Sequence, residues 1–399
     1  MKEKKETLAQ SVSLEMGMAI REARDEVQWG LNYFLWYLDN AQKYLNPEIT
    51  FENESEIHRV YYEPKGIVLA IAPWNYPSLL FVWTCIQALL AWNSVIFKTS
   101  KEVILTWKMI ADIVKNSSLP KWVWEEVYGD GKIGDILTRQ DVDFITFTGS
   151  TNVGKNIAKI VWEKWIGCVM ELWWSAPWII CEDAKIDEVL ATIYYMRFSN
   201  CGQMCDGLKR LIVHETKYEE LKEKLSSLLS QKKVWIAQQE DTDIGPLVSE
   251  SQLQNLQEQY DNAINLWAKI VFQSQLSPDL KWSYFAPTLL ENISFDMKIW
   301  KEEVFWPILP IVPFKEIDEA IQLANDTPYW LWAYIFTENK STFEKIAKKI
   351  KTGMVQMNNV NYCIPEDPFW GYKNSWIGRE HGKWGFYEFT NVKVTSSPK

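Results

Sequence analysis

Short apolar segments typical of strands alternate with longer segments typical of helices along most of this chain. In the first half, the expected strands are 57–63, 66–74, 94–98 and 142–150, and the expected helical regions are 5–45, 78–91, 102–116 and 152–162. The second half repeats the alternation, with helices at 186–200, 216–230 and 249–265 and strands at 210–214 and near 269 and 308. Parallel strands need a crossover, usually a helix, so this order predicts an α/β fold with parallel sheets.

Composition excludes several classes of protein. The 399 residues are enough for two or three domains. A net charge of −10 opposes binding to nucleic acid or to an anionic membrane, so neither is an expected partner. There is no apolar run long enough for a membrane span and no secretory signal in MKEKKETLAQ. Six cysteines are too few for a disulfide scaffold, so we expect a cytoplasmic protein.

Two motifs follow expected strands, at the edge where sites gather in α/β sheets. FTGSTNVG (147–154) leads from a strand into a helix, and backbone N–H groups at such a helix start suit a phosphate. The alternative is that Gly149 and Gly154 serve only the turn and the packing. IAPWNYP (71–77) places Asn75 just past a strand, where its amide could stabilise an oxyanion or simply cap a turn.

A third motif, RFSNCGQMCDG (197–207), contains two cysteines four residues apart. No metal site is expected, because the three histidines are remote in sequence and no CxxC pair occurs. A loop around Gly202 and Gln203 would expose Cys205 as a nucleophile whose thiolate is stabilised. Burial as an ordinary structural cysteine is the alternative, and it is the expectation for Cys85, Cys168 and Cys181.

Together these motifs resemble those of the aldehyde dehydrogenase superfamily, over residues 5–395. Phe198–Cys205 matches F-x-N-x-G-Q-x-C, Pro73–Pro77 matches P-W-N-[FY]-P, and Glu171 begins ELWW where the family has E-L-G-G. KEEVFWPILP (301–310), TPYWLWAYIFT (327–337) and PFWGYKNSWIGREHGKWG (368–385) match three further motifs in the family's order.

The resemblance implies a fold and its division. A Rossmann-type cofactor domain would comprise 1–45 and 65–173, and an α/β catalytic domain would comprise 174–385. The segments 46–64 and 386–399 would form a small strand-arm oligomerisation element, which implies a homodimer or homotetramer. Family members usually carry several tens of residues before the helical segment at 14–27, so the cofactor domain is expected to be short at its N-terminal edge.

The resemblance also implies a reaction. The Cys205 thiolate would attack an aldehyde carbonyl, and Asn75 with the backbone N–H of Cys205 would hold the oxyanion. After hydride transfer from the thiohemiacetal to NADP or NAD, Glu171 would activate water to hydrolyse the thioester to the carboxylic acid. The remaining expected cofactor-binding residues are Trp74, Lys98, Lys101, Gly149, Ser150, Glu303 and Phe305. Members that prefer NAD often carry Glu where this chain has Lys101, so the cation predicts that NADP is used at least as well.

The substrate is less constrained. The spacing from Arg197 to Arg210 resembles the succinate-semialdehyde dehydrogenase group, which favours succinate semialdehyde or a similar small semialdehyde. Some members of that group have an Arg where this chain has Ser199. A dehydrogenase for a different aldehyde is one alternative, and an inactive binding or structural protein of the same family is another.

Tryptophan is unusually abundant, with 23 residues against 17 glycines. The family has glycine at ten of these positions and probably at two more; the ten are Trp92, Trp122, Trp173, Trp174, Trp235, Trp267, Trp306, Trp330, Trp370 and Trp376, and the two are Trp282 and Trp332. Trp92 stands where a left-handed helix cap is expected, and Trp330 and Trp332 flank Leu331 in a tight connection, where a Cβ is expected to be strained. We hypothesise that UGA codons meaning glycine are written as tryptophan; UGG at 173 and 174 would contradict this. A truly Trp-rich protein is the alternative.

Overall fold

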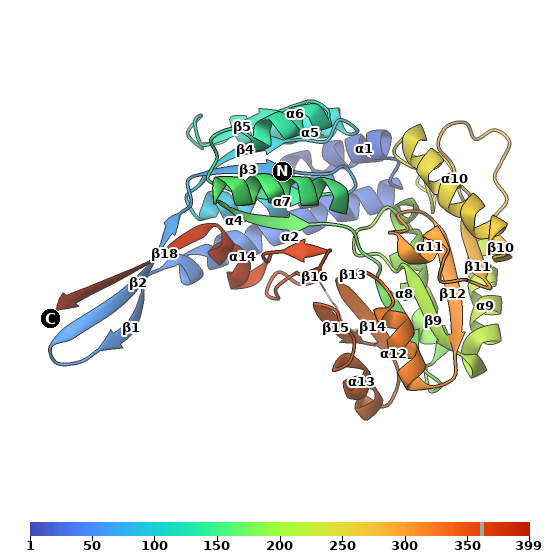
Figure 1. Cartoon of the computed structure of the whole chain (residues 1–399). Coiled ribbons are helices and arrows are strands. Elements are labelled where there is room, and N and C mark those ends of the chain that lie inside the picture. Colours follow the sequence, from blue (N-terminus) through green and yellow to red (C-terminus); the bar gives the residue numbers. More distant parts are fainter. Residues whose placement is uncertain (360–362) are drawn as a thin grey trace.

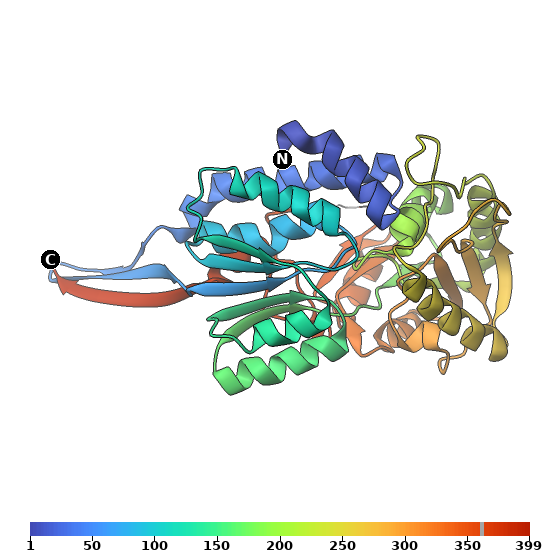
Figure 2. The ribbon, with the colours of Figure 1, turned by 90° about the horizontal axis from the view of Figure 1, so that it is seen from above.

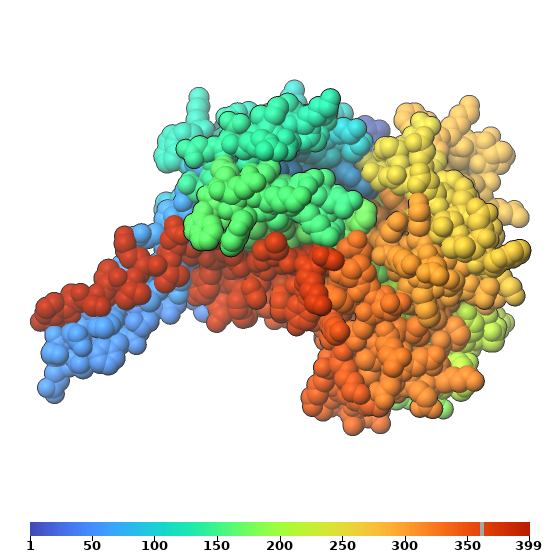
Figure 3. All heavy atoms as spheres, in the orientation of Figure 1, coloured from blue at the N-terminus to red at the C-terminus, as the bar shows by residue number. Residues whose placement is uncertain are grey.

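The computed structural model describes residues 1–359 and 363–399. Within these residues the strands form two large sheets, a three-stranded arm and a small two-stranded sheet. The two large sheets lie side by side, and the arm projects away from both of them (Figures 1 and 3). The predicted α/β fold with parallel sheets is therefore confirmed.

The first large sheet contains near its centre the strands that lead into IAPWNYP (71–77) and FTGSTNVG (147–154) and the strand that ends at Glu171. Its order is β17-β7-β6-β3-β4-β5, and β3 to β7 are parallel. Their bounds are β3 Ile67–Ile71, β4 Ser94–Lys98, β5 Trp124–Val127, β6 Phe144–Thr148, β7 Gly167–Glu171 and β17 Trp376–Ile377. The interior strands are apolar because helices cover both faces. Figure 2 shows α1 Lys5–Met16, α2 Ile20–Leu45 and α5 Ile104–Lys115 on one side, and α6 Gly131–Thr138 and α7 Thr151–Lys164 on the other.

The second large sheet has the order β10-β11-β12-β9-β8-β14-β15. Its strands are β8 Pro177–Ile180, β9 Arg210–His214, β10 Lys269–Gln273, β11 Thr288–Glu291, β12 Ile308–Phe314, β14 Trp332–Phe336 and β15 Met354–Met357, and β10 alone among them runs antiparallel to its neighbour. The helices of this half are α8 Ile186–Phe198, α9 Glu215–Ser230, α10 Glu250–Asn265, α11 Lys298–Lys301, α12 Ile317–Asn325 and α13 Lys340–Ala347. The small sheet pairs β13 Tyr329–Trp330 with β16 Tyr372–Lys373.

The arm consists of β1 Glu48–Glu52, β2 Glu56–Pro64 and β18 Thr390–Pro398, all antiparallel. It joins the two polar segments that were predicted as strand arms, and it exposes the apolar side chains of Ile49, Phe51, Val392 and Val394. Such an exposed apolar sheet is the kind of surface that another chain covers.

Three details differ from the sequence-based expectations. The helical region 5–45 breaks at Gly17, whose φ is +83° and whose added Cβ would lie 2.5 Å from the carbonyl oxygen of Pro246. The run 78–91 comprises α3 Pro77–Phe81, a π-helical turn at Val82–Ile86 and α4 Gln87–Leu90. The range 174–385, expected to form the catalytic domain, includes β17, which pairs with β7 of the first sheet, and the start of α14 Gly382–Glu388, which packs on α2. Among the described residues, no helix combines the length and the apolar character needed to cross a bilayer.

Candidate active site

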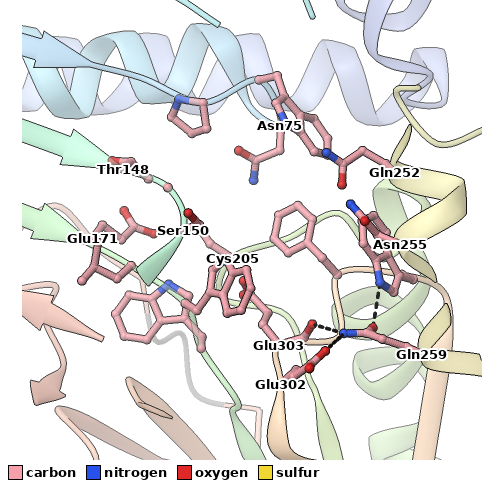
Figure 4. A pocket seen from close by; sticks show the side chains of 18 of the residues that line it. Asn75, Thr148, Ser150, Glu171, Cys205, Gln252, Asn255, Gln259, Glu302 and Glu303 are labelled. Atoms are coloured by element: carbon pink, nitrogen blue, oxygen red, sulfur yellow. Dashed lines mark hydrogen bonds between the residues drawn. The ribbon is translucent and has the colours of Figure 1, made fainter. Parts of the chain in front are cut away.

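A cavity of about 440 Å³ opens at the carboxyl ends of the first sheet, where it faces the second half of the chain. Figure 4 shows Asn75, Thr148, Ser150 and Glu171 entering it from one side and Gln252, Asn255, Gln259, Glu302 and Glu303 from the other, with Cys205 between them. Eight predicted site residues line this one cavity: Trp74, Asn75, Gly149, Ser150, Glu171, Cys205, Glu303 and Phe305. Thr148 and Glu171 are direct partners in the β6–β7 ladder, which explains why motifs 23 positions apart meet here.

Asn75 is held against the loop that carries Cys205. Its side chain is buried, and its Nδ2 donates to the backbone oxygen of Gln203 at 3.2 Å. In return, Nδ2 of Asn200 donates to the backbone oxygen of Asn75 at 3.1 Å. Pro77 at the first position of α3 turns the chain just after Asn75. The amide is therefore oriented by the nucleophile loop itself, rather than by a local turn.

The loop before Cys205 has an unusual backbone. Asn200, Cys201 and Gly202 all have positive φ, at 51°, 54° and 75°. A Cβ at Gly202 would lie 2.5 Å from the backbone of Trp306, so only glycine fits there. Gln203 fixes the loop by donating from Nε2 to Asn200 O at 3.0 Å and accepting from Val248 N at 2.9 Å. The Asn and Gln of this motif are thus structural supports, a role that the sequence analysis missed.

Cys205 and Glu171 share an environment that favours their neutral forms. Cys205 is partly buried, and burial together with the charge of Glu171 raises the pKa of its thiol well above 9.0. Glu171 is 1% exposed, and burial, with a contribution from the charge of Glu380, raises the pKa of its carboxyl group well above 4.5. The expectation of a thiolate stabilised by its loop is therefore wrong for the protein alone, because the surrounding charges are acidic. A proton acceptor or a cation must oppose them before the sulfur ionises.

The buried ammonium group of Lys209 binds the loop that carries Cys205. Lys209 is fully buried, and its Nζ donates to Met204 O at 2.6 Å and lies 3.7 Å from Oε1 of Glu303. The same ammonium lies 4.7 Å from the centre of the Phe305 ring. Burial lowers the pKa of Lys209 to about 8 and raises that of Glu303 to about 7. The sequence pattern does not distinguish Lys209 from a surface lysine. Its role is seen only in the structure, where Lys209 and Glu303 are both buried.

In FTGSTNVG (147–154), different residues serve the two roles considered above, phosphate binding and packing. Ser150 is the N-cap of α7, with its hydroxyl accepting from Val153 N at 3.4 Å, and it lines the cavity with Gly149. A Cβ at Gly154 would lie 2.2 Å from a Leu172 methyl carbon, so this glycine serves packing. The first turn of α7 thus presents its positive dipole end at the cavity edge, as a phosphate-binding helix does.

Lys98 and Lys101, the two lysines predicted to bind the cofactor, do not line this cavity. Lys98 ends β4 and is buried, and its Nζ donates to the backbone oxygen of Gly129, in the loop after β5, at 2.7 Å. Lys101 is exposed, with its Nζ 3.7 Å from Glu102. Among the described residues, no group of three histidine, cysteine or acidic side chains is placed to hold a metal ion.

The tryptophans fall into two structural groups. Trp92, Trp267 and Trp282 have positive φ, as does Trp165, which is not among the twelve positions compared with the family, and the left-handed cap predicted at Trp92 is confirmed. In contrast, neither Trp330 nor Trp332 has positive φ, so the strain expected there is wrong: both lie in strands and are buried.

Trp173 and Trp174 occupy part of the cavity wall. Trp174 is fully buried, and its indole N–H has no hydrogen-bond partner among the described residues. An unpaired buried N–H costs free energy, so this indole is poorly accommodated where it stands. The two rings reduce the room available beside Glu171.

The model of the aldehyde dehydrogenase family matches residues 1–395, and the chain belongs to this family. A mitochondrial succinate-semialdehyde dehydrogenase of Oryza sativa subsp. japonica is 32% identical over 391 residues, which cover 98% of this chain and 74% of the relative. The peroxisomal aminoaldehyde dehydrogenase 2 of Pisum sativum is 32% identical over 397 residues, covering 98% and 79%.

Solved structures agree with this assignment. The NAD⁺ complex of an aldehyde dehydrogenase from Bacillus cereus has a TM-score of 0.94 at 29% identity, covering 100% of this chain and 81% of that one. A structure described as an E. coli NADP-dependent enzyme has a TM-score of 0.95 at 26% identity, covering 100% and 83%. Both nicotinamide cofactors therefore occur among proteins of this fold.

Proposed function

We propose that this protein oxidises an aldehyde to its carboxylic acid with NAD or NADP, with Cys205 as nucleophile, Asn75 in the oxyanion site and Glu171 as general base. The observation that carries the proposal is that these three side chains, which lie far apart in sequence, line one cavity. The family gives the class of reaction. The cavity supplies a thiol, a buried amide donor and a buried carboxyl group, which are the groups that this reaction needs.

The chemistry follows from what each residue holds. The Cys205 thiol transfers its proton to a neighbouring carboxylate, and the sulfur adds to the carbonyl carbon of the aldehyde. The oxygen of the resulting thiohemiacetal carries negative charge, and the Asn75 amide and the backbone N–H of Cys205 donate to it. Loss of hydride leaves a thioester on Cys205. Glu171 takes a proton from water, which attacks the thioester carbon and releases the acid and the thiol.

The described residues fit a nicotinamide dinucleotide. The start of α7 suits the pyrophosphate, and Glu303 is a buried carboxyl group suited to a ribose hydroxyl. When bound, the oxidised nicotinamide carries a positive charge and accepts the hydride. Lys101 would favour a 2′-phosphate by its charge. Because Lys101 does not line the described cavity, its contact with the cofactor is a proposal.

Succinate semialdehyde receives no support from the cavity chemistry. The names of the relatives include both a carboxylate-bearing semialdehyde and amino aldehydes, so they do not select between these substrates.

The test uses the purified protein with a panel of short aldehydes and follows absorbance of the reduced nicotinamide. We expect turnover that Cys205→Ala abolishes. Glu171→Gln should retain a single burst of reduced cofactor but lose steady turnover, because the thioester forms and is not hydrolysed. The chain is also made with Trp173 and Trp174 both replaced by glycine. Failure of both forms on every aldehyde would support the inactive family member and refute the proposal.

We also propose that the arm of β1, β2 and β18 joins two or more copies of the chain. Its exposed apolar residues support this, and light scattering of Phe51→Lys against the unchanged protein tests it: the variant should have the smaller mass. Residence in the cytoplasm stays a prediction.

A further inference from the structure

Lys209 is a lysine that the fold removes from water. It follows Cys205 in the same loop, its side chain is 0% exposed, and it does not line the cavity beside Cys205. A buried ammonium group loses its solvation, so its partners must replace the water that it has lost. The surroundings of this ammonium group therefore indicate what Lys209 does in the site.

The ammonium group of Lys209 connects two segments that meet at the cavity. Its Nζ donates to the backbone oxygen of Met204 at 2.6 Å, in the peptide that leads to Cys205. The same Nζ lies 3.7 Å from Oε1 of Glu303 and 4.7 Å from the centre of the Phe305 ring. Cys205, Glu303 and Phe305 all line the cavity. Lys209 therefore joins the nucleophile loop to the segment that follows α11.

The Glu303 carboxylate depends on this cation. Its Oε1 is buried and accepts no hydrogen bond among the described residues, so the ion pair with Lys209 is what compensates its charge. The titratable groups that act on Lys209 are, in order of strength, Glu303, Arg197, Cys205 and Asp206. The guanidinium of Arg197 donates to the backbone oxygens of Leu208 at 2.6 Å and Val304 at 3.1 Å, so its N–H groups are directed at the backbone.

The part of the cofactor that Glu303 would contact follows from the proposed reaction. Hydride leaves the carbon bonded to Cys205, which requires the nicotinamide end of the cofactor near this sulfur. Glu303 lines the same cavity, so the ribose next to the nicotinamide is the one that its carboxylate would bind. A hydrogen bond from a hydroxyl to a carboxylate is about twice as strong as one to a neutral acceptor.

We propose that Lys209 is a positioning residue, whose buried ammonium group holds the Glu303 carboxylate against the nucleophile loop and strengthens the hydrogen bond from the nicotinamide ribose to that carboxylate. This inference rests on the proposed function and adds to it a residue outside the cavity wall. Burial raises the pKa of Glu303 to about 7, and the charge of Lys209 opposes this rise. Burial lowers the pKa of Lys209 to about 8, so both groups are charged between these two values.

The first experiment measures the Kd of NAD⁺ by titration calorimetry for the unchanged protein and for Lys209→Met. We expect the variant to raise this Kd about fivefold or more at about pH 7.5. At about pH 9 the increase should fall below about twofold, because Lys209 of the unchanged protein has then lost most of its charge. ADP, which lacks the nicotinamide ribose, should bind both proteins equally at both pH values.

The matched control is Lys222→Met. Lys222 is also a buried lysine, its Nζ lies 2.6 Å from Oε2 of Glu291, and it does not line the cavity. This variant should leave the Kd of NAD⁺ unchanged at both pH values. Reduction of NAD⁺ affinity by Lys222→Met to the same degree would overturn the inference, because loss of any buried ion pair would then suffice.

Two further variants separate charge from packing. Lys209→Gln keeps an N–H donor but lacks the charge, and it should raise the Kd of NAD⁺ as Lys209→Met does. When Glu303 is already replaced by Gln, Lys209→Met should change the Kd by less than about twofold, because the carboxylate on which it acts is gone. A full additional loss in the double variant would refute the connection between the two residues.

The unchanged protein supplies a measurement that needs no variant. Between about pH 7.5 and pH 5.5, where Glu303 gains its proton, the Kd of NAD⁺ should rise about fivefold while that of ADP stays constant. A parallel response of NAD⁺ and ADP would overturn the inference even if the Lys209 variants failed to fold.

The outcomes separate this inference from the proposed function. Turnover of an aldehyde, together with an NAD⁺ Kd that Lys209→Met leaves unchanged or raises equally at both pH values, would overturn the inference alone. The expected pH-dependent loss of affinity without turnover on any aldehyde would refute the proposed oxidation and support the role of Lys209. The chain with glycine at positions 173 and 174 is measured in parallel, and failure of both forms to bind NAD⁺ would refute both proposals.

Discussion

Replacing four exposed tryptophans by glycine should stabilise this protein. Trp92, Trp165, Trp267 and Trp282 have φ values of 66°, 59°, 71° and 90°, and their side chains are 83%, 78%, 81% and 92% exposed. A residue with a Cβ pays roughly 1–2 kcal/mol in this backbone region. Glycine loses more chain entropy on folding, which returns roughly 0.5–1 kcal/mol of that gain. The net stabilisation is about 0.5–1 kcal/mol per site.

Three of the sites follow α4, α7 and α10 and the fourth, Trp282, lies in the loop between β10 and β11, so their effects should add to about 2–4 kcal/mol. The matched control is Trp162→Gly: this residue is three positions before Trp165, is 71% exposed, and lies inside α7. There glycine should destabilise by roughly 0.5 kcal/mol, because it is the poorer helix former. The two rings contact each other, with centroids 4.8 Å apart, so each variant loses the same contact.

Urea unfolding followed by circular dichroism measures these differences as shifts of the midpoint at constant slope. Trp165→Gly should raise the midpoint and Trp162→Gly should lower it. Equal losses in both variants would show that backbone strain does not decide the effect, and the structural argument for glycine at these positions would fail. Reading the codons is the companion test: UGA is expected at positions 92, 165, 267 and 282, as at 173 and 174.

Three further predictions concern charge. Alkylation of Cys205 by iodoacetamide, mapped by mass spectrometry, should rise about tenfold per pH unit up to about pH 9, because the pKa of its thiol is raised above 9.0. A plateau near pH 7 would contradict this. Burial raises the pKa of Glu26 from 4.5 to about 7, so the folded state holds this proton more tightly and the free energy of unfolding falls as pH rises between those values. Urea unfolding should show that Glu26→Gln removes about 3 kcal/mol of this fall. Parallel pH profiles for the two proteins would refute the prediction. Lys101→Glu should lower kcat/KM for NADP relative to NAD by about tenfold or more, and strict NAD use by the unchanged protein would refute the contact.

The sequence predicted those parts of the fold that carry periodic patterns. The buried parallel strands β3, β4 and β6 are continuous apolar runs, and their motifs mark the carboxyl edge where the site lies. Strands of two residues such as β17 have no period to detect, so the return of the chain to the first sheet was missed. The break at Gly17 is a left-handed glycine cap, a local signal that the periodic pattern of residues 5–45 obscured, and its close approach to Pro246 leaves no room for a Cβ.

The residues of the candidate site were likewise predicted only where they belong to a sequence motif. Cys205, Asn75 and Glu171 were predicted because their motifs resemble those of the aldehyde dehydrogenase superfamily, and the structure brings all three to one cavity. The raised pKa of the Cys205 thiol was not predicted, because Glu171 of β7, the adjacent Asp206 and Glu303 after α11 converge on the thiol only in three dimensions.

Two carboxyl groups on α2 show how positions outside the motifs define the site. Glu22 accepts from Asn200 N at 2.8 Å, and Glu26, one turn later, accepts from Leu79 N at 2.8 Å. The first bond fixes the left-handed loop before Cys205, and the second fixes the helix that follows Asn75. In sequence both glutamates belong to the charged run REARDEV, which is typical of a solvated helix face. Because desolvation raises the pKa of each to about 7, neither is a surface charge, and a single helix sets the spacing between the proposed nucleophile and its oxyanion donor.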